Sequence, residues 1–168
     1  MSKRELEVVA EPGSPRVLMR RTVDAPRSLV FDMFTKPELV TRWKGPRHFE
    51  VTLCEVDLRV GGTWRISYRM PNGGELGLHG EFSEVARPER VVRTLCFTGQ
   101  PGKVIETFLF EERAGRTLIT TISDYESVEA RDAYLGTGVK WGMEEAYERL
   151  DQLLEQMIGA DVQPARLV

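Results

Sequence analysis

Residues 48–125 consist of segments in which apolar and polar side chains alternate, and this repetition limits the possible folds more than any other feature of the chain. Six such segments follow one another: HFEVTLCEVDLRV, GTWRISYRM, ELGLHGEFSEVA, RVVRTLCFT, VIETFLFEER and TLITTISDY. Alternation with period two is typical of strands that have one buried and one exposed face. The connections are short, and PNGG at 71–74 and RAGR at 113–116 are candidate hairpin turns. The segment 48–125 therefore predicts six successive antiparallel strands.

A helical pattern follows the last of these segments. Apolar residues recur at steps of three and four, at Val139, Met143, Ala146, Leu150, Leu153 and Met157. This spacing predicts a long amphipathic helix with one apolar stripe. The charged residues Glu144, Glu145, Glu148, Asp151 and Glu155 are expected on the solvated face. A curved antiparallel sheet needs a cover for its inner face, and this helix is the only element long and apolar enough to provide it.

The residues before the alternating segments predict one strand and two short helices. Residues 16–25, RVLMRRTVDA, read as a strand. A helix is expected over PRSLVFDMFT, with Pro26 in its first turn and Asp24 near its cap. A second helix is expected over PELVTRW, which begins at Pro37 and is closed by KGP.

Together these elements predict an α+β fold with a single domain. The sheet should be antiparallel and curved, with about six to seven strands wrapped around the long C-terminal helix, and two short helices should follow the first strand. The domain is expected to span residues 16–158. A flexible N-terminal segment is expected at 1–15, with a short strand within 6–10, and a flexible C-terminal tail at 159–168.

Composition and charge exclude several classes of protein. A net charge of −3 with scattered Lys and Arg disfavours nucleic-acid binding. No apolar run resembles a signal peptide or a membrane span, so no membrane partner and a cytoplasmic location are expected. The two cysteines, Cys54 and Cys96, are too few for a structural zinc site and are expected as buried thiols, with a single bridge as the alternative. His48 and His79 match no metal-ligand spacing and no phosphate loop is present, so neither a metal nor a cofactor is expected.

The segment VGGTWRISYRM places large side chains on one face of a strand. Alternation puts Trp64, Ile66, Tyr68 and Met70 on the apolar face, and Thr63, Arg65, Ser67 and Arg69 on the wet face. The apolar face either packs into a core or lines a cavity, since Trp and Tyr also carry a polar group that a packed interior must satisfy. Gly61 and Gly62 are read as a turn and bend that let the sheet curve.

Three stretches of the chain resemble a known family. They are VDAPRSLVFDMFTKPELVTRWKGP at 23–46, VDLRVGGTWRISYRMPNGGELGLHGEFSEVARPERVVRTLCF at 56–97 and GVKWGMEEAYERLDQLL at 138–154. The chain resembles the START-like (SRPBCC) helix-grip superfamily, and more narrowly the family named for homologues of the activator of the heat-shock-protein-ninety ATPase. The terminal helix of that family usually carries Gly followed by Trp, whereas here Met143 follows Gly142 and Trp141 lies off the apolar stripe.

The resemblance implies a sheet that grips the helix around an internal cavity, in a fold that hosts lipid carriers, polyketide cyclases, stress proteins and co-chaperones. We predict a protein that binds an apolar, aromatic or lipid-like small molecule between sheet and helix, with no assigned reaction. The predicted ligand-binding residues are Trp43, Trp64, Ile66, Tyr68, His79, Met143 and Tyr147. The resemblance also places Trp43 at the rim of the cavity mouth, although a tryptophan that plugs one end of the core is the equal alternative.

Two other functions stay open on the sequence. The family name implies a chaperone partner whose ATPase the chain would modulate. A cyclase or hydrolase type of enzyme would use His79, between Gly77 and Gly80, with Glu106 or Asp124 from late strands if these point inward. Trp141, off the apolar stripe, hints at a contact between two copies of the chain and so at a homodimer.

Overall fold

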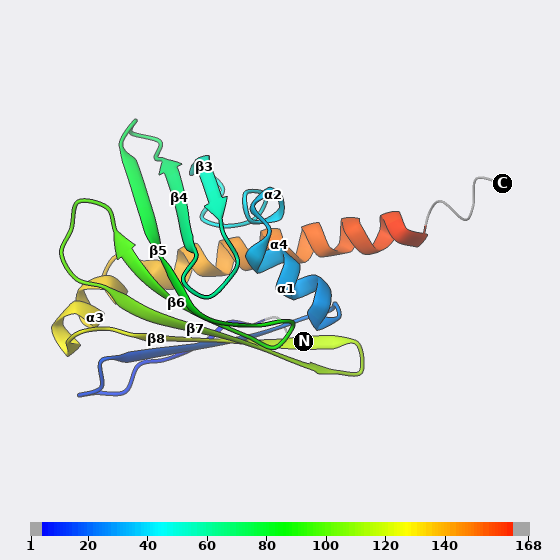
Figure 1. The fold of residues 1–168 in the computed structure, drawn as a ribbon, viewed down its shortest axis with the longest axis horizontal. Coiled ribbons are helices and arrows are strands. Elements are labelled where there is room, and N and C mark those ends of the chain that lie inside the picture. The colour runs from blue at the N-terminus through cyan, green and yellow to red at the C-terminus, as the bar shows by residue number, and fades with distance from the viewer. Residues whose placement is uncertain (1–4, 163–168) are drawn as a thin grey trace.

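One antiparallel sheet of eight strands dominates the structure, a computed structural model that describes residues 5–162 (Figure 1). The strand order is β1-β2-β8-β7-β6-β5-β4-β3. The strands are β1 (Glu7–Val9), β2 (Arg16–Val23), β3 (Glu50–Val56), β4 (Thr63–Arg69), β5 (Glu75–Ala86), β6 (Arg90–Phe97), β7 (Val104–Arg113) and β8 (Arg116–Asp124). The six strands predicted for 48–125 are therefore confirmed. Strand β2 is the strand predicted at 16–25 and makes seven, and β1, paired with β2 at the edge of the sheet, is the eighth.

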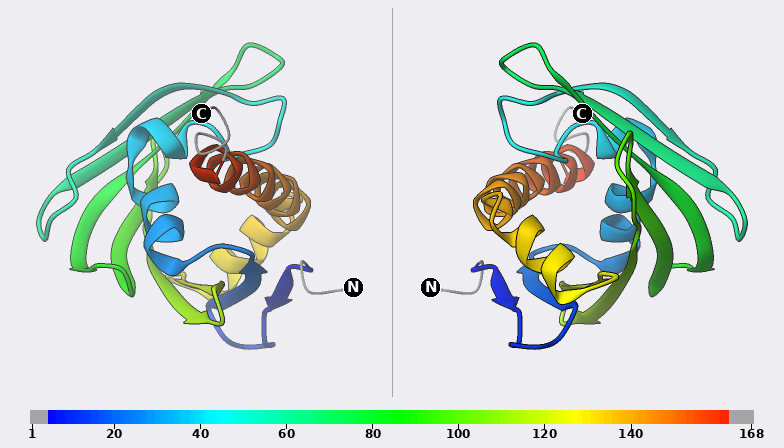
Figure 2. Two further views of the ribbon diagram at one scale, coloured as in Figure 1. Left: turned by 90° about the vertical axis from the view of Figure 1, so that its right-hand side faces the viewer. Right: turned by 90° about the vertical axis from the view of Figure 1, so that its left-hand side faces the viewer.

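Four helices accompany the sheet: α1 (Arg27–Thr35), α2 (Pro37–Val40), α3 (Val128–Leu135) and α4 (Val139–Val162). Figure 2, which looks along α4 from both ends, shows the sheet curving around this helix, with α1 and α2 between the sheet and α4 on one side. This is the predicted helix-grip arrangement. Pro26 is the N-cap residue of α1 and not part of its first turn. Asp24 does not cap the helix but accepts a hydrogen bond of 2.7 Å from Arg116 Nε.

Helix α3 was not predicted from the sequence. Ser127 caps it, because its Oγ accepts a 3.0 Å hydrogen bond from the Ala130 backbone N–H. The helix ends at Gly136, and Gly138 with φ +81° separates it from α4. Its eight residues have little apolar periodicity, so the sequence pattern did not distinguish this helix from a turn.

The N-terminal segment contributes the short strand expected within 6–10. That strand is β1, and Val8 pairs with Met19 of β2. Arg131 of α3 has only 4% of its surface exposed and donates to the carbonyl oxygens of Glu11 (2.6 Å) and Ser14. These contacts hold part of the segment predicted as flexible against the sheet. The predicted C-terminal tail begins inside α4, and residues 163–168 lie outside the described part of the chain.

The apolar stripe predicted for the last helix faces the sheet, and Ala146, Leu150 and Leu153 are buried. One charged residue departs from the expectation. Asp151 accepts two hydrogen bonds, of 2.9 and 2.7 Å, from Arg21 of β2. These side chains are only 12% and 3% exposed, so Asp151 joins helix to sheet and is not part of the solvated face.

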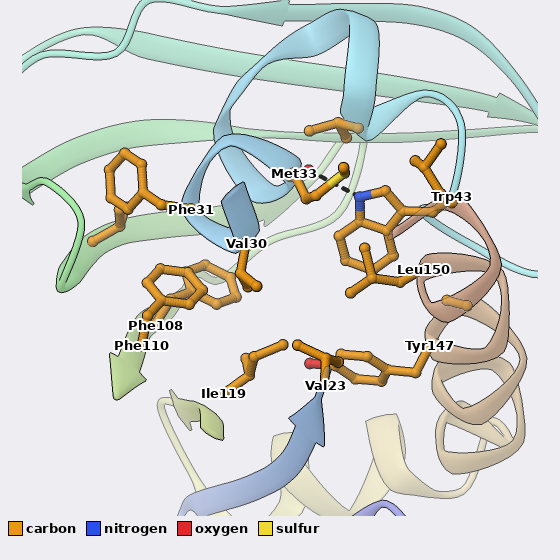
Figure 3. Close-up of a cluster of buried hydrophobic side chains, with 14 of the residues drawn as sticks. Val23, Val30, Phe31, Met33, Trp43, Phe108, Phe110, Ile119, Tyr147 and Leu150 are labelled. Atoms are coloured by element: carbon orange, nitrogen blue, oxygen red, sulfur yellow. Dashed lines mark hydrogen bonds between the residues drawn. The ribbon is translucent and has the colours of Figure 1, made fainter. Parts of the chain in front are cut away.

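The core fills the space among α1, the sheet and the middle of α4, as Figure 3 shows for its largest buried side chains. Trp43 is fully buried and its Nε1 donates a 2.9 Å hydrogen bond to the Met33 carbonyl. Cys54 and Cys96 are free thiols, so the alternative of a bridge between them is wrong, and both are half-buried where full burial was expected. No helix within residues 5–162 has the length and apolar character needed to cross a bilayer.

Candidate functional site

A cavity of about 100 Å³ lies between the inner face of the sheet and α4. Most of its wall is apolar, from Val17, Met19, Phe34, Trp64, Ile66, Leu78, Leu95, Phe97, Val104, Phe108 and Met143. Its polar lining consists of Lys44, Arg93, Glu106, Thr121, Ser123, Tyr125, Tyr134 and Tyr147. A second cavity of about 20 Å³ adjoins it and shares the residues Phe34, Lys44, Trp64, Ile66 and Arg93. The two cations therefore lie where the cavities meet.

Four of the predicted ligand-binding residues line the large cavity: Trp64, Ile66, Met143 and Tyr147. The first two come from the sheet and the last two from α4, so both layers contribute to the wall. Trp43 lines only the small cavity, and its full burial with a bonded indole N–H fits the role of a core plug. Alternation on β4 thus predicted the orientation of Trp64 and Ile66 correctly.

Tyr68 is buried with its β4 neighbours but lies outside the wall of both cavities. Its ring packs against Gly45, where a Cβ atom would come within 2.9 Å of Tyr68 Cε1, and near Phe49, at 6.1 Å between ring centres. Gly45 also has φ +84°, a conformation that favours glycine. Tyr68 therefore supports the loop after α2 and is not part of the cavity.

His79 lies on the outer face of β5, and its predicted role in the cavity is wrong. Leu78 points into the cavity, so alternation turns the next side chain outward, where His79 is exposed. Its Nδ1 lies 3.1 Å from Thr98 Oγ1. Gly77 and Gly80 lack side chains because other groups, and not His79, occupy the space beside them. A Cβ at Gly80 would meet the Thr94 carbonyl and Trp64 Nε1, and one at Gly77 would meet Thr98.

The two acidic residues considered with His79 lie apart from it. Glu106 points into the large cavity. Asp124 is paired with Arg16 at the end of β8, with 2.7 Å between Oδ1 and Nε. The three side chains proposed for a cyclase or hydrolase do not converge, and that set of residues is not a catalytic group.

Lys44 is a cavity residue that sequence reasoning did not identify. It follows the buried Trp43 and precedes Gly45, and both neighbours hold its backbone in place. Arg149 of α4 fixes the same loop by donating to the carbonyl oxygens of Gly45 (3.0 Å) and Arg42 (3.1 Å). The KGP sequence thus ends the helical segment and also directs an amine toward the cavities.

The ammonium group of Lys44 lies among aromatic rings. Its Nζ is 5.2 Å from the ring centre of Trp43, 5.6 Å from that of Phe34 and 5.8 Å from that of Phe108. Within residues 5–162 no carboxylate forms an ion pair with it. Burial, and then the charge of Arg93, lower the pKa of Lys44 to about 8, although Glu106 and Cys54 act in the opposite direction.

Arg93 of β6 is the second cation that the sequence analysis missed. Its Nε donates a 2.8 Å hydrogen bond to Glu106 Oε1, and the two side chains are only 11% and 14% exposed. Its guanidinium carbon lies 3.7 Å from the centre of the Trp64 ring. A sequence signal existed, because Arg93 is in register with the inward-facing Val91 and Leu95 along the strand.

Tyrosines form a further polar part of the wall. Tyr125 and Tyr134 have ring centres 5.6 Å apart, and Phe97 lies 6.0 Å from Tyr134. Tyr147 is fully buried and forms a hydrogen bond with Thr121, and burial raises the pKa of Tyr147 to about 12. These hydroxyl groups therefore stay protonated at neutral pH and act as neutral hydrogen-bonding groups.

Trp141 is 58% exposed and its ring centre lies 5.7 Å from that of the exposed His48. It has no part in either cavity, in agreement with its place off the apolar stripe. The homodimer contact considered for Trp141 stays a prediction.

Comparison with known proteins adds a family and solved structures to this geometry. The model of the family described as Activator of Hsp90 ATPase homolog 1-like protein matches residues 24–155. A crystal structure of a protein from Rhodobacter sphaeroides is 29% identical, with 90% of this chain and 99% of that chain covered and a TM-score of 0.84. A solution structure of a protein from Arthrobacter aurescens is 25% identical, with 89% of this chain and 91% of that chain covered and a TM-score of 0.80. A solution structure of a protein from Staphylococcus epidermidis is 27% identical, with 88% of this chain and 93% of that chain covered and a TM-score of 0.76. The curated proteins gave no match.

Proposed function

Because the chain belongs to the family of Activator of Hsp90 ATPase homolog 1-like proteins, within the helix-grip fold, we propose that it binds a small apolar or aromatic molecule between its sheet and α4. The observation that carries this proposal is the cavity of about 100 Å³, whose wall comes from both layers and is mainly apolar. Cavities of this order take up small aromatic molecules, since one of roughly 150 Å³ in another protein binds benzene.

The composition of the wall supports the same function. Ligand sites are mostly apolar, with a few polar groups that orient the ligand. Here the polar groups are the Lys44 and Arg93 pair, with Glu106, and the hydroxyl groups of Tyr125 and Tyr134. Burial of the ligand would supply the free energy, at roughly 25 cal/mol per Å² of apolar surface removed from water. The polar groups would then select among ligands of similar size.

A titration with benzamide, a single-ring ligand, followed by calorimetry, tests the proposal. Ser123 lines the cavity, so Ser123→Phe should fill it and weaken binding by at least about tenfold. Ile105 is 45% exposed and pairs across the strands with Asp124, next to Ser123, so Ile105→Phe is the matched control and should bind as the wild type does. Equal binding by both variants would place the ligand elsewhere and contradict the proposal. Native mass spectrometry of the freshly purified protein would show whether a small molecule accompanies it.

A second candidate is a protein that modulates a chaperone ATPase. The family match, by its description, is the observation that favours it. The test is the ATPase rate of a purified chaperone of the ninety-kilodalton heat-shock class with increasing amounts of this chain. A saturable rise in rate is the expected result. An unchanged rate, together with no chaperone in a pull-down from lysate, would contradict this second function.

A further inference from the structure

The cavity wall carries an excess of positive charge where the two cavities meet. Lys44 and Arg93 both line it, whereas Glu106 is the only carboxylate among the lining residues that the structure describes. The two cations flank one ring, since Lys44 Nζ lies 5.8 Å and Arg93 Cζ lies 4.9 Å from the centre of Phe108. Glu106 is already engaged by Arg93 Nε at 2.8 Å. One positive charge therefore remains without a counter-ion beside an apolar space.

The cations also have hydrogen-bonding capacity left over. Within residues 5–162, Arg93 uses only Nε in a hydrogen bond to the protein, and Lys44 Nζ has no carboxylate partner. A partly buried ammonium without a counter-ion is costly, because the surrounding rings replace only part of its hydration. A protein that needed these groups for packing alone would be served as well by apolar side chains of the same volume. The arrangement suits a group that arrives with the opposite charge.

We propose that the ligand carries a carboxylate on its apolar or aromatic body, and that Lys44 and Arg93 bind this carboxylate beside the adjoining rings of Phe108 and Phe34. The inference rests on the proposed function, and it adds the chemical class of the ligand. The aromatic rings exclude water from the ion pair, which strengthens it relative to a pair at the surface. The apolar body then extends along Leu95 and Met143 toward Tyr134.

The test compares two single-ring ligands of the same shape, benzoate and neutral benzamide, by calorimetry near pH 7. Wild type should prefer the carboxylate by about tenfold or more, as a charged hydrogen bond within the cavity would give. Lys44→Met should remove most of this preference and keep the binding of the amide. Lys140→Met is the matched control, because Lys140 is a 59% exposed lysine of α4 paired with Glu144, and it should keep the preference.

Three results separate this inference from the proposed function. Equal affinity of wild type for both ligands, with loss of both in Ser123→Phe, would overturn the carboxylate site and leave the cavity function standing. No binding of either ligand would overturn both. A preference that persists in Lys44→Met and in the second variant, Lys44→Gln, would show that Lys44 does not bind the carboxylate.

A pH series adds a readout that a purely structural role would not change. The groups that face Lys44 are Arg93 from β6, Glu106 from β7 and Cys54 from β3. Since the pKa of Lys44 is lowered to about 8, the preference for benzoate should weaken in wild type between about pH 7 and about pH 9.5. In Lys44→Met the affinity should not change over this range. A pH-independent preference in wild type would contradict the role of Lys44.

Discussion

The guanidinium carbon of Arg93 lies 3.7 Å from the centre of the Trp64 ring, and the indole Nε1 of Trp64 donates a 2.9 Å hydrogen bond to the carbonyl of Thr94. Trp64 belongs to β4, whereas Arg93 and Thr94 belong to β6. The indole therefore reaches over the intervening strand β5, at Gly80, its direct partner in the pairing register. This contact connects three strands at the wall of the cavity and fixes the position of one of its two cations.

Gly80→Ala should destabilise the protein because the Thr94 carbonyl and the Trp64 indole occupy the space a Cβ would need. A Cβ at position 80 would lie 1.8 Å from the Thr94 carbonyl oxygen and 2.8 Å from Trp64 Nε1. We expect the free energy of unfolding, measured with urea, to fall by about 2 kcal/mol or more. Gly142→Ala is the control, since its Cβ would lie 3.5 Å from Pro46 in ordinary contact within a helix. That change should be neutral or stabilising by up to about 1 kcal/mol. A similar loss in both variants would contradict this explanation.

Arg93→Met alone should lower the free energy of unfolding more than the double variant that combines it with Glu106→Gln. The single change leaves a carboxylate that is only 14% exposed without its partner, which costs about 3 kcal/mol in comparable buried pairs. The double change removes the unpaired charge and so recovers part of this loss. A double-mutant cycle by urea denaturation measures the coupling between the two residues. Strictly additive losses would show that Arg93 and Glu106 do not depend on each other.

Lys44→Met should stabilise the protein near neutral pH, at the expense of ligand selectivity. The folded state lowers the pKa of Lys44 from 10.5 to about 8, chiefly through burial. Below about pH 8 the lysine is charged in both states, and its burial lowers the free energy of unfolding by the full amount. Between about pH 8 and about pH 10.5 the unfolded state binds more protons than the folded state, so this loss of stability shrinks as the pH rises. The variant should exceed wild type by about 2 kcal/mol at pH 7, and the difference should shrink toward pH 10. Urea denaturation at both pH values checks this, and a difference that does not vary with pH would contradict it.

Asp151→Ala should detach α4 from β2 and lower the free energy of unfolding by about 3 kcal/mol. The change leaves Arg21, 3% exposed, without the carboxylate that accepts hydrogen bonds of 2.9 and 2.7 Å. Glu55→Ala is the control, because Glu55 and Arg65 are paired at 3.8 Å with 62% and 61% of their side chains exposed. Such a surface pair contributes less than about 1 kcal/mol. Equal losses in the two variants, measured by thermal or urea denaturation, would show that Asp151 does not anchor the helix.

The sheet and the long helix could be predicted because their periodicities are repeated many times. Period-two alternation on β4 put Trp64 and Ile66 on the inner face, and the structure confirms it. The same rule also shows why the expectation for His79 was wrong, since its neighbour Leu78 takes the inward position. Helix α3 escaped prediction because it is short and its apolar residues have no clear period.

The charged part of the site could not be predicted because it depends on pairing between strands. Arg93 and Glu106 lie directly opposite each other in the register of β6 and β7. Alternation along its own strand puts Arg93 on the inner face with Val91 and Leu95, and Glu106 with Val104 and Phe108, but neither strand shows that a charge there has a partner. Each is buried because the other neutralises it. The position of Lys44 in the cavity was not predicted for a different reason. Its loop is directed toward the cavity by hydrogen bonds from Arg149 and by the burial of Trp43, and both are tertiary contacts.

The central claim is that a small molecule binds between the sheet and α4, and intermolecular nuclear Overhauser effects test it most directly. Ile66 of β4 and Met143 of α4 line opposite walls of the cavity, and their methyl groups can be labelled with ¹³C. With benzamide bound, ligand protons should show effects to both methyl groups, and none to Ile105 or Ile158, which are 45% and 37% exposed. Effects confined to the exposed residues, or binding without contact to Ile66 and Met143, would contradict the claim.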